Sequence, residues 1–185
     1  MENYLVNGDE KVNKKPIRKT IRLQGYDYSQ AGCYFVTVCV ANKKPILSKI
    51  TYNNSQRNNL PYLIELLPMG VEIGKTINYI NENYNQVEIE KYVIMPDHIH
   101  LIVTFMGKDE LDADRQGCLS LRDVVKRLKT YTTREYRRKT GDKNSVLWQQ
   151  RYYDHVIRNQ EDYNEKWQYI ENNPLKYILL SEGQL

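Results

Sequence analysis

Two histidines one residue apart, in the run MPDHIHL at residues 95–101, have the type and spacing for chemistry. If the run is a strand, His98 and His100 point to one side, because residues two apart share a face, and Ile99 and Leu101 point to the core. Two imidazoles on one face can hold a divalent metal ion. A structural role is the alternative, but the chain has three histidines and two of them are here. By the same alternation Asp97 should point away, as a turn residue or as support behind the ligands.

A tyrosine and an asparagine four residues apart form a second candidate set, in the run WQYIENNP at residues 167–174. Positions four apart share a face of a helix, so Tyr169 and Asn173 should project together. The apolar face of the same helix would carry Trp167, Ile170 and Tyr163. The alternative is a tyrosine at a packed helix edge and an asparagine near a helix C-terminus.

The third histidine, His155, lies in the run LWQQRYYDHVIRN at residues 147–159. It could contact a substrate directly, but we favour a structural hydrogen bond or a supporting role behind the site. Tyr152 and Tyr153 are alternatives to Tyr169 as a nucleophilic tyrosine, although the start of a strand gives them no asparagine on the same face.

Hydrophobic periodicity predicts the elements that must position these residues. We expect strands at 34–40, 60–67, 87–95, 98–105 and 148–157, and helices at 69–84, 121–139 and 162–173. Ser120 is a candidate N-cap, Pro174 should end the last helix, and residues 41–60 and 107–118 should be loops. The strands 87–95 and 98–105 should pair as a hairpin. The expected fold is α+β, a ferredoxin-like sandwich with a mainly antiparallel sheet and helices packed on it.

Positive charge is concentrated in two segments, although the net charge is only +4. Residues 11–26 hold no acid, and residues 120–143 hold nine Lys or Arg against three acids. Such patches indicate a polyanionic partner, with solvated basic faces as the alternative. Sixteen tyrosines against two phenylalanines add side chains that can stack on bases. The candidate DNA-binding residues are Arg18, Lys19, Lys126, Arg127, Lys129, Arg134, Arg137 and Arg138.

Composition excludes several other classes of protein. No stretch approaches the roughly 20 apolar residues of a membrane span, and the N-terminus has no apolar signal region. The three cysteines match no zinc or redox spacing, so we expect reduced thiols. We therefore expect a cytoplasmic, nucleoid-associated protein with a basic flexible arm at 1–20 and a single domain at 21–180.

Five separated motifs, taken together, resemble the IS200-like transposase family, and most closely its REP-associated tyrosine transposase branch. They occur in the same order as in the family, from about residue 18 to residue 177: RLQGYDYSQAGCYFVTV, YVIMPDHIHLIV, VVKRLKTYTTREYRR, LWQQRYYDHVIRN and YIENNP.

The resemblance implies a ferredoxin-like fold, dependence on Mg²⁺ or Mn²⁺, and cleavage of single-stranded DNA near hairpins formed by palindromic repeats. His98 and His100 match the metal-binding pair of the family, and Tyr169 matches the nucleophile that forms a 5′-phosphotyrosine. Asn173 matches the third ligand position, where better-known insertion-sequence relatives carry glutamine. Both monomers and homodimers are compatible with the resemblance.

Three other functions remain to be compared. A domesticated DNA-hairpin-binding protein without transposition activity would not need the intact set of His98, His100, Tyr169 and Asn173. A phosphoesterase with two His-x-Thr motifs is disfavoured, because the chain has no His-x-Thr. An RNA-binding ferredoxin-like domain would need neither the histidine pair nor the tyrosine.

Overall fold

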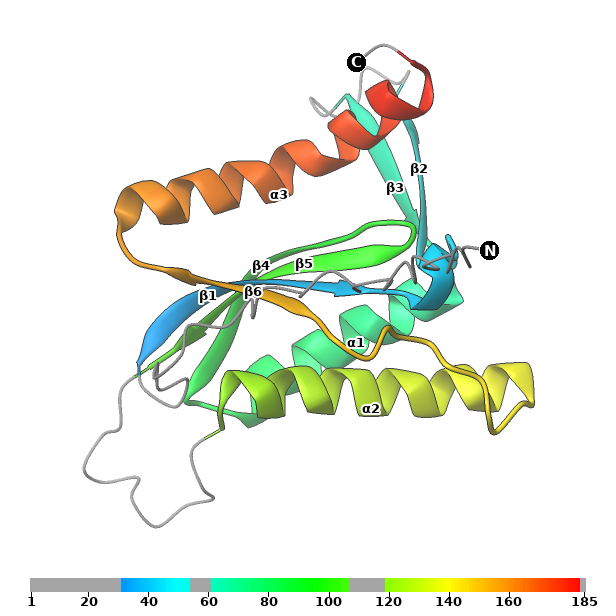
Figure 1. Cartoon of the computed structure of the whole chain (residues 1–185), viewed down its shortest axis with the longest axis horizontal. Coiled ribbons are helices and arrows are strands. Elements are labelled where there is room, and N and C mark those ends of the chain that lie inside the picture. The colour runs from blue at the N-terminus through cyan, green and yellow to red at the C-terminus, as the bar shows by residue number, and fades with distance from the viewer. Residues whose placement is uncertain (1–30, 54–60, 107–118, 184–185) are drawn as a thin grey trace, which may run out of the picture.

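A four-stranded antiparallel sheet forms the centre of the molecule in the computed structural model, which describes residues 31–53, 61–106 and 119–183. The strands are β1 (Gly32–Cys39), β4 (Val87–Ile94), β5 (His98–Phe105) and β6 (Tyr153–Ile157), in the spatial order β4-β5-β1-β6. Of the described strands, the first along the chain is thus an inner strand and the last is an edge strand (Figure 1). This arrangement is the expected ferredoxin-like α+β sandwich. The proposed basic arm, with Arg18 and Lys19, and the expected loop at 107–118 lie outside the described residues.

Helices cover both faces of this sheet (Figure 1). Helices α1 (Pro68–Asn83) and α2 (Leu121–Thr140) lie together on one face, and α3 (Gln160–Ser181) lies across the other. Alternation along β5 serves both layers: Ile99 packs in the larger core on the α1–α2 side, and Ile102 packs in the smaller core beneath α3. Every second residue of β5 therefore faces α3, and His98 and His100 belong to that set.

The β4–β5 hairpin is held at the bend that precedes His98. The Met95 N–H donates to the His98 carbonyl, and the bend carbonyls of Pro96 and Asp97 accept from Leu47 and Val40. The predicted hairpin is confirmed, with Val93 opposite His100 and Ile94 opposite Ile99. Because this bend is tied to neighbouring backbone, the direction of the first β5 side chains is well defined.

The basic helix α2 begins and ends at specific caps. The Ser120 hydroxyl accepts from the Asp123 N–H while the Asp123 carboxylate accepts from the Ser120 N–H, which satisfies two free N–H groups at once. At the other end Gly141 takes a left-handed conformation (φ 71°), which glycine adopts without a steric penalty. The predicted N-cap at Ser120 is confirmed.

Three predictions about secondary structure differ from the structure. Residues 41–60 were expected to be loops, but β2 (Ser48–Tyr52) pairs with β3 (Tyr62–Leu66) as a separate two-stranded sheet. Its half-buried residues Ile50 and Ile64 face each other and pack against the core beneath α3. Short polar strands of this kind are stabilised by tertiary packing, which local propensity does not report.

Pro174 was expected to end the last helix, but α3 continues through it to Ser181. Proline removes one backbone donor and usually breaks a helix. Here Pro174 and Ile178 are buried, and the second half of α3 packs near β2 and β3. The burial of these apolar side chains offsets the lost hydrogen bond. The last strand is also shorter than the predicted 148–157, with Trp148 joined to Val40 only by an isolated bridge.

The helices in the described part of the chain were also compared with the requirements of a membrane span. None of them combines the length and the apolar composition needed to cross a bilayer.

Candidate active site

The two histidines of β5 point to the same side of the sheet, toward α3. Their Nε2 atoms lie 3.1 Å apart, and their ring centroids are separated by 4.7 Å. Ile99, between them, is fully buried on the opposite face. The strand geometry therefore produces the paired imidazoles that the spacing predicted.

The outer nitrogen of each ring has its own hydrogen-bond partner. Asp97 Oδ1 lies 2.6 Å from His98 Nδ1, and Thr37 Oγ1 lies 2.8 Å from His100 Nδ1. A carboxylate only accepts, so Nδ1 of His98 donates and Nε2 keeps its lone pair in the neutral ring. The Thr37 hydroxyl can accept from His100 Nδ1 in the same way. Two lone pairs then face each other across 3.1 Å, an arrangement that a shared cation stabilises.

Asp97 was expected to alternate away from the histidines, and this orientation was wrong. Residue 97 precedes β5 and belongs to the bend, so the strand alternation does not apply to it. Its contact with His98 is that of a residue behind a metal ligand, the other part of the expectation.

Burial keeps His100 neutral. His100 is 4% exposed, and this burial, together with the nearby His98, lowers the pKa of its imidazole from 6.5 to about 3. A neutral imidazole is the form that binds metals, because the ligand nitrogen must carry a free lone pair.

Tyr169 and Asn173, on α3, lie next to this pair of histidines. The Tyr169 ring centroid lies 5.1 Å from that of His100, and Asn173 Nδ2 lies 3.4 Å from His100 Nε2. Tyr169 is 44% exposed, so part of its side chain is accessible to a large substrate. A groove of about 290 Å³ on this side of α3 is lined by Glu165, Gln168, Tyr169, Asn172, Asn173 and Lys176.

Phe35 and Thr37 complete the surroundings of His100, and sequence reasoning missed both. The Phe35 ring stacks on His100 with centroids 5.2 Å apart and meets the Tyr169 ring edge-on at 5.6 Å. Both residues lie on β1, which pairs with β5 so that Thr37 is directly opposite His100. Their spacing of two in a strand was visible, but only the register of β1 against β5 shows which residues they meet.

Polar contacts along the outer strand β4 hold α3 in place. Tyr163 donates to Glu90 at 2.6 Å, and Lys91 pairs with Glu171 at 2.7 Å while its ammonium lies over the Trp167 ring. The predicted apolar face of α3 is present, since Ile170 is buried and Tyr163 and Trp167 pack beside it.

His155 lies on β6 directly across from Phe35. Its Nε2 is bonded to both carboxylate oxygens of Asp162, at 2.9 and 2.8 Å, in the first turn of α3. Its contacts in the described structure thus connect the sheet to the start of the helix that carries Tyr169. The rival tyrosines differ from Tyr169: Tyr152 packs against the core on the α1–α2 side, and Tyr153 is an exposed residue of β6.

The side chains present fit a divalent metal ion with two nitrogen ligands and one amide ligand. Within the described residues no three His, Cys, Asp or Glu side chains converge, so a third protein ligand has to be of another type. Asn173 could supply it through its amide oxygen, since its amide nitrogen lies 3.4 Å from His100 Nε2. An amide oxygen and water suit Mg²⁺ and Mn²⁺, whereas imidazole nitrogens suit softer divalent ions such as Zn²⁺ and Fe²⁺.

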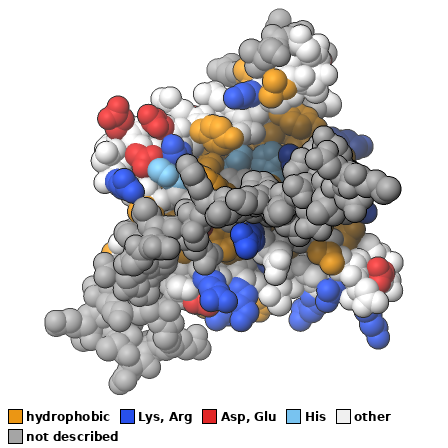
Figure 2. All heavy atoms as spheres, in the orientation of Figure 1, with side chains coloured by type: hydrophobic (Ala, Val, Ile, Leu, Met, Phe, Trp, Pro, Cys, Tyr) orange, Lys and Arg blue, Asp and Glu red, His pale blue; other side chains and the backbone are white. Residues whose placement is uncertain are grey.

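The basic residues of α2 differ in whether their charged groups face solvent or bond to the protein. Lys126, Arg127 and Arg134 line an open cavity on the helix surface, whereas Lys129 donates to the carbonyls of Gln149, Gln150 and Arg151. Burial lowers the pKa of Lys129, consistent with a structural position. Lys and Arg side chains gather over the lower part of the surface in Figure 2, where Figure 1 places α2.

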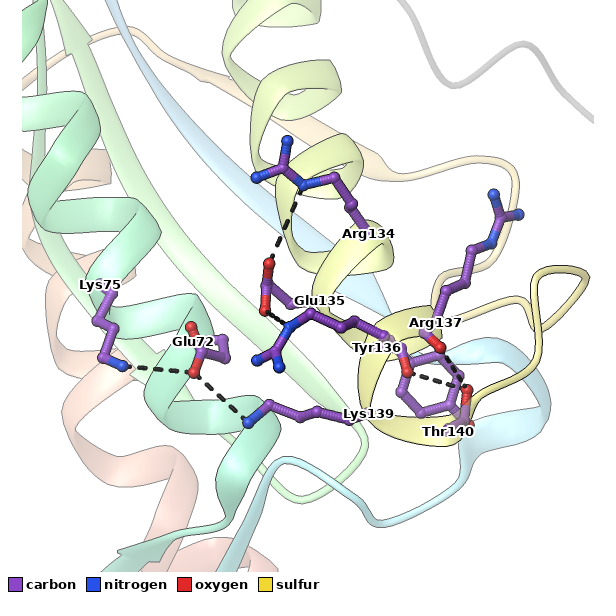
Figure 3. A network of polar contacts seen from close by, with 9 residues as sticks. Glu72, Lys75, Arg134, Glu135, Tyr136, Arg137, Lys139 and Thr140 are labelled. Atoms are coloured by element: carbon purple, nitrogen blue, oxygen red, sulfur yellow. Dashed lines mark hydrogen bonds and ion pairs between the residues drawn. The ribbon is translucent and has the colours of Figure 1, made fainter.

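The last turns of α2 carry a network of charged contacts (Figure 3). Arg138 pairs with Glu135 at 2.8 Å, Lys139 reaches Glu72 of α1 at 3.6 Å, and Arg137 donates to the Ser145 carbonyl. Arg137 and Arg138 remain exposed, so they can still meet an anion while they hold these contacts.

Comparison with known proteins agrees with the fold and the site. The family model described as "Transposase IS200 like" matches residues 68–173, more than half of the chain, so the kind of protein is a DNA-processing transposase. The chain belongs to the IS200-like transposase family. Transposases of this family are generally metal-dependent.

The relatives and the solved structures include proteins of the REP-associated branch. An uncharacterised protein of Haemophilus influenzae is 31% identical over 180 residues, which is 91% of this chain and 92% of that protein. The REP-associated tyrosine transposase of Escherichia coli K12 is 32% identical over 90 residues, 49% of this chain and 46% of that protein. A solved REP-associated tyrosine transposase bound to a REP hairpin shares the fold, with a TM-score of 0.53, 24% identity, and coverage of 82% of this chain and 72% of that one.

Proposed function

We propose that this transposase nicks and rejoins single-stranded DNA through a 5′-phosphotyrosine, with Tyr169 as the nucleophile and His98, His100 and Asn173 as metal ligands. The observation that carries the proposal is the convergence of Tyr169 and Asn173 from α3 on the two imidazoles of β5. These residues come from segments about 70 positions apart in the chain. Simple packing does not require a tyrosine, an amide and two facing imidazoles at one point.

A phenol is in general a weak nucleophile at neutral pH. A bound Mg²⁺ or Mn²⁺ would polarise the scissile phosphate and stabilise the charge that develops on it. The neutral side chains of His98, His100 and Asn173 would leave the full charge of the ion available for this. Asp97 and Thr37 orient the two imidazoles, and Phe35 restricts the positions of the His100 and Tyr169 rings.

In the chemical step the Tyr169 oxygen forms a bond to phosphorus and loses its proton to solvent. The bond from phosphorus to the 3′ oxygen breaks, and that oxygen takes up a proton to become a 3′-hydroxyl. The phosphotyrosine retains the ester, so a 3′-hydroxyl can reverse the reaction without ATP. The exposure of Tyr169 beside an open groove suits attack on a polymer.

The proposed substrate is hairpin DNA formed by palindromic repeats. The solved structural neighbour is bound to a REP hairpin, and one relative is named a REP-associated tyrosine transposase. The cations of α2 that line the open cavity, Lys126, Arg127 and Arg134, supply contacts for phosphates, with Arg137 and Arg138 further along the helix. We further propose one domain at 21–180, a DNA-binding arm at 1–20, and a place in the cytoplasm with the nucleoid.

Covalent attachment tests the proposal directly. Wild-type protein incubated with Mn²⁺ and a 5′- or 3′-labelled single-stranded hairpin should yield a denaturant-resistant adduct that carries the DNA downstream of the nick. Tyr169→Phe should abolish this adduct while it leaves hairpin binding within about 2-fold, because one hydroxyl is a small part of a DNA interface. The measurement is a denaturing gel beside a native binding assay.

Tyr177→Phe is the matched control, since Tyr177 lies two turns further along α3 and is 36% exposed. It should form the adduct as the wild type does. An adduct that persists in Tyr169→Phe would assign the nucleophile elsewhere. Binding without any adduct in the wild type would favour the domesticated DNA-hairpin-binding protein.

A further inference from the structure

Tyrosines and arginines form a cluster on the helical layer, on the opposite side of the sheet from His98 and His100 (Figure 1). Tyr79 and Tyr84 come from the end of α1, and Arg127, Tyr131 and Arg134 come from α2. We call these five residues the tyrosine–arginine surface. None of them takes part in the chemical step proposed above, although Arg127 and Arg134 are among the proposed phosphate contacts.

The rings and guanidinium groups of the tyrosine–arginine surface are in mutual contact. The centroids of Tyr79 and Tyr131 are 5.9 Å apart, and those of Tyr79 and Tyr84 are 6.5 Å apart. The Arg127 guanidinium lies 4.9 Å from the Tyr84 centroid, and that of Arg134 lies 5.8 Å from the Tyr131 centroid. These contacts restrict the side chains before any ligand arrives, which lowers the entropy cost of binding.

Much of this aromatic area remains in contact with water. Tyr79 is 43% exposed and Tyr131 is 39% exposed, and neither belongs to the apolar clusters of the core. Neighbouring exposed rings beside arginines are a surface on which a flat, unpaired base can stack. The core thus does not account for these tyrosines.

The adjacent cavity has the charge that a nucleotide requires. It measures about 460 Å³ and is lined by Asp123, Lys126, Arg127, Thr130, Tyr131 and Arg134. Asp123 is its one acid among the described lining residues, and its carboxylate is engaged by the Ser120 hydroxyl and N–H of the capping box. The three cations therefore dominate the cavity and are complementary to phosphate.

We propose that the tyrosine–arginine surface binds an unpaired nucleotide of the DNA substrate, with the base against Tyr131 and Tyr79 and the flanking phosphates on Lys126, Arg127 and Arg134. The inference rests on the proposed function, since it takes single-stranded DNA as the substrate. It adds a second contact region, separated from the scissile phosphate by the thickness of the sheet. Unpaired bases bound there distinguish a hairpin with loops or flanks from plain duplex DNA.

The test measures binding alone, in Tyr169→Phe protein with EDTA, so that neither cleavage nor metal contributes. The probes are a fluorescent hairpin with single-stranded flanks and a fully paired duplex with the same number of phosphates. Tyr131→Ala should weaken hairpin binding by about 10-fold, the scale of one lost base–aromatic stack. Duplex binding should change by less than about 2-fold, because the phosphate contacts remain.

Two variants make the outcome specific to stacking. Tyr131→Phe keeps the ring and should bind the hairpin as the parent does. Tyr92→Ala removes a tyrosine of equal exposure, 39%, from β4 and should have no effect on either probe. In the parent, 2-aminopurine placed at the bound position should be quenched, and Tyr131→Ala should restore its fluorescence.

Failure of this inference differs from failure of the proposed function. If Tyr131→Ala binds the hairpin as tightly as the parent does, the stacking site alone is overturned. The same holds if Tyr131→Ala loses affinity for the hairpin and for the duplex equally. A parent that binds neither probe overturns the proposed DNA substrate, and the inference with it.

Discussion

At the scale of single residues, the site depends on which nitrogen of each imidazole is occupied. Asp97 and Thr37 engage the Nδ1 atoms, which leaves the two Nε2 atoms facing each other at 3.1 Å. Burial favours the neutral form of His100, so the pair is prepared for a cation rather than for a proton. Metal binding and acid stability should therefore both depend on His100.

Replacing both ligands, in His98→Ala with His100→Ala, should remove metal-stimulated cleavage, a loss on the order of 100-fold or more for an electrostatic stabiliser of this kind. Titration calorimetry with Mn²⁺ should show no binding to the double variant. His155→Ala is the control, because the third histidine contacts Asp162 and should leave Mn²⁺ binding intact. Unchanged Mn²⁺-dependent cleavage in the double variant would exclude these ligands.

His100 also gives the metal-free protein a predictable dependence on acid. Its pKa is about 3 when folded and 6.5 in the absence of burial, so between these values the unfolded chain binds the proton and the folded chain does not. The contribution of His100 to the free energy of unfolding is complete above pH 6.5. It declines as the pH falls toward 3, by at most about 1.4 kcal/mol per pH unit.

Urea unfolding from pH 7 to pH 4 in EDTA measures this decline. Glutamine does not titrate, so the unfolding free energy of His100→Gln should fall less steeply with acid than that of the wild type. The difference in slope should correspond to at most one proton taken up on unfolding. If the wild type and the variant lose stability in parallel, His100 is not the buried neutral group.

At the scale of elements, α3 is the component whose position matters most for chemistry. Ile170 is the one buried residue in the first half of α3, and Tyr163 and Trp167 are only partly buried beside it. Polar contacts with β4, as in Lys91–Glu171 and Tyr163–Glu90, add to this small apolar contact. The bond from Lys91 is the main reason why the pKa of Glu171 is lowered. A helix attached in this way can be displaced without unfolding the sheet.

Lys91→Met should therefore slow cleavage while hairpin affinity and melting temperature change little. We expect a loss of roughly 10-fold or more, since a misplacement of about 1 Å can cost on the order of 100-fold. Single-turnover adduct formation is the measurement. Lys75→Met is the matched control, because Lys75 pairs with Glu72 on α1, away from α3. Equal rates in the two variants would mean that the Lys91 contact does not position Tyr169.

At the scale of the whole molecule, the sheet separates two surfaces with different roles. The α3 side carries the histidines and the tyrosine, and the α1–α2 side carries the cavity-lining cations Lys126, Arg127 and Arg134. DNA that contacts both sides has to pass around an edge of the sheet. Its affinity should then fall with salt, while the chemical step should not.

Combined Lys126→Ala, Arg127→Ala and Arg134→Ala should reduce the slope of log affinity against log salt by about 2, since each single-strand phosphate contact contributes about 0.7. The measurement is hairpin binding from 50 to 300 mM salt, with Lys75→Ala as the control for removal of a cation. Adduct formation at saturating DNA should persist in the triple variant. A slope equal to that of the wild type would remove these residues from the interface.

The local patterns were enough to predict the chemical groups and most of the elements. Alternation in 98–105 determined that His98 and His100 share a face, and helical spacing determined that Tyr169 and Asn173 do. Hydrophobic periodicity and helix caps depend only on residues that are close in the sequence. The sequence therefore predicted β5 and the start of α2 at Ser120 directly.

Only the tertiary structure decided which faces meet. Phe35 and Thr37 reach His100 through the register of β1 with β5, and α3 runs past Pro174 because Ile178 is buried. Asp97 turns back to His98 because it lies in a bend tied to Val40. Such contacts join segments far apart in the chain, and their energies come from burial and pairing that no single segment contains.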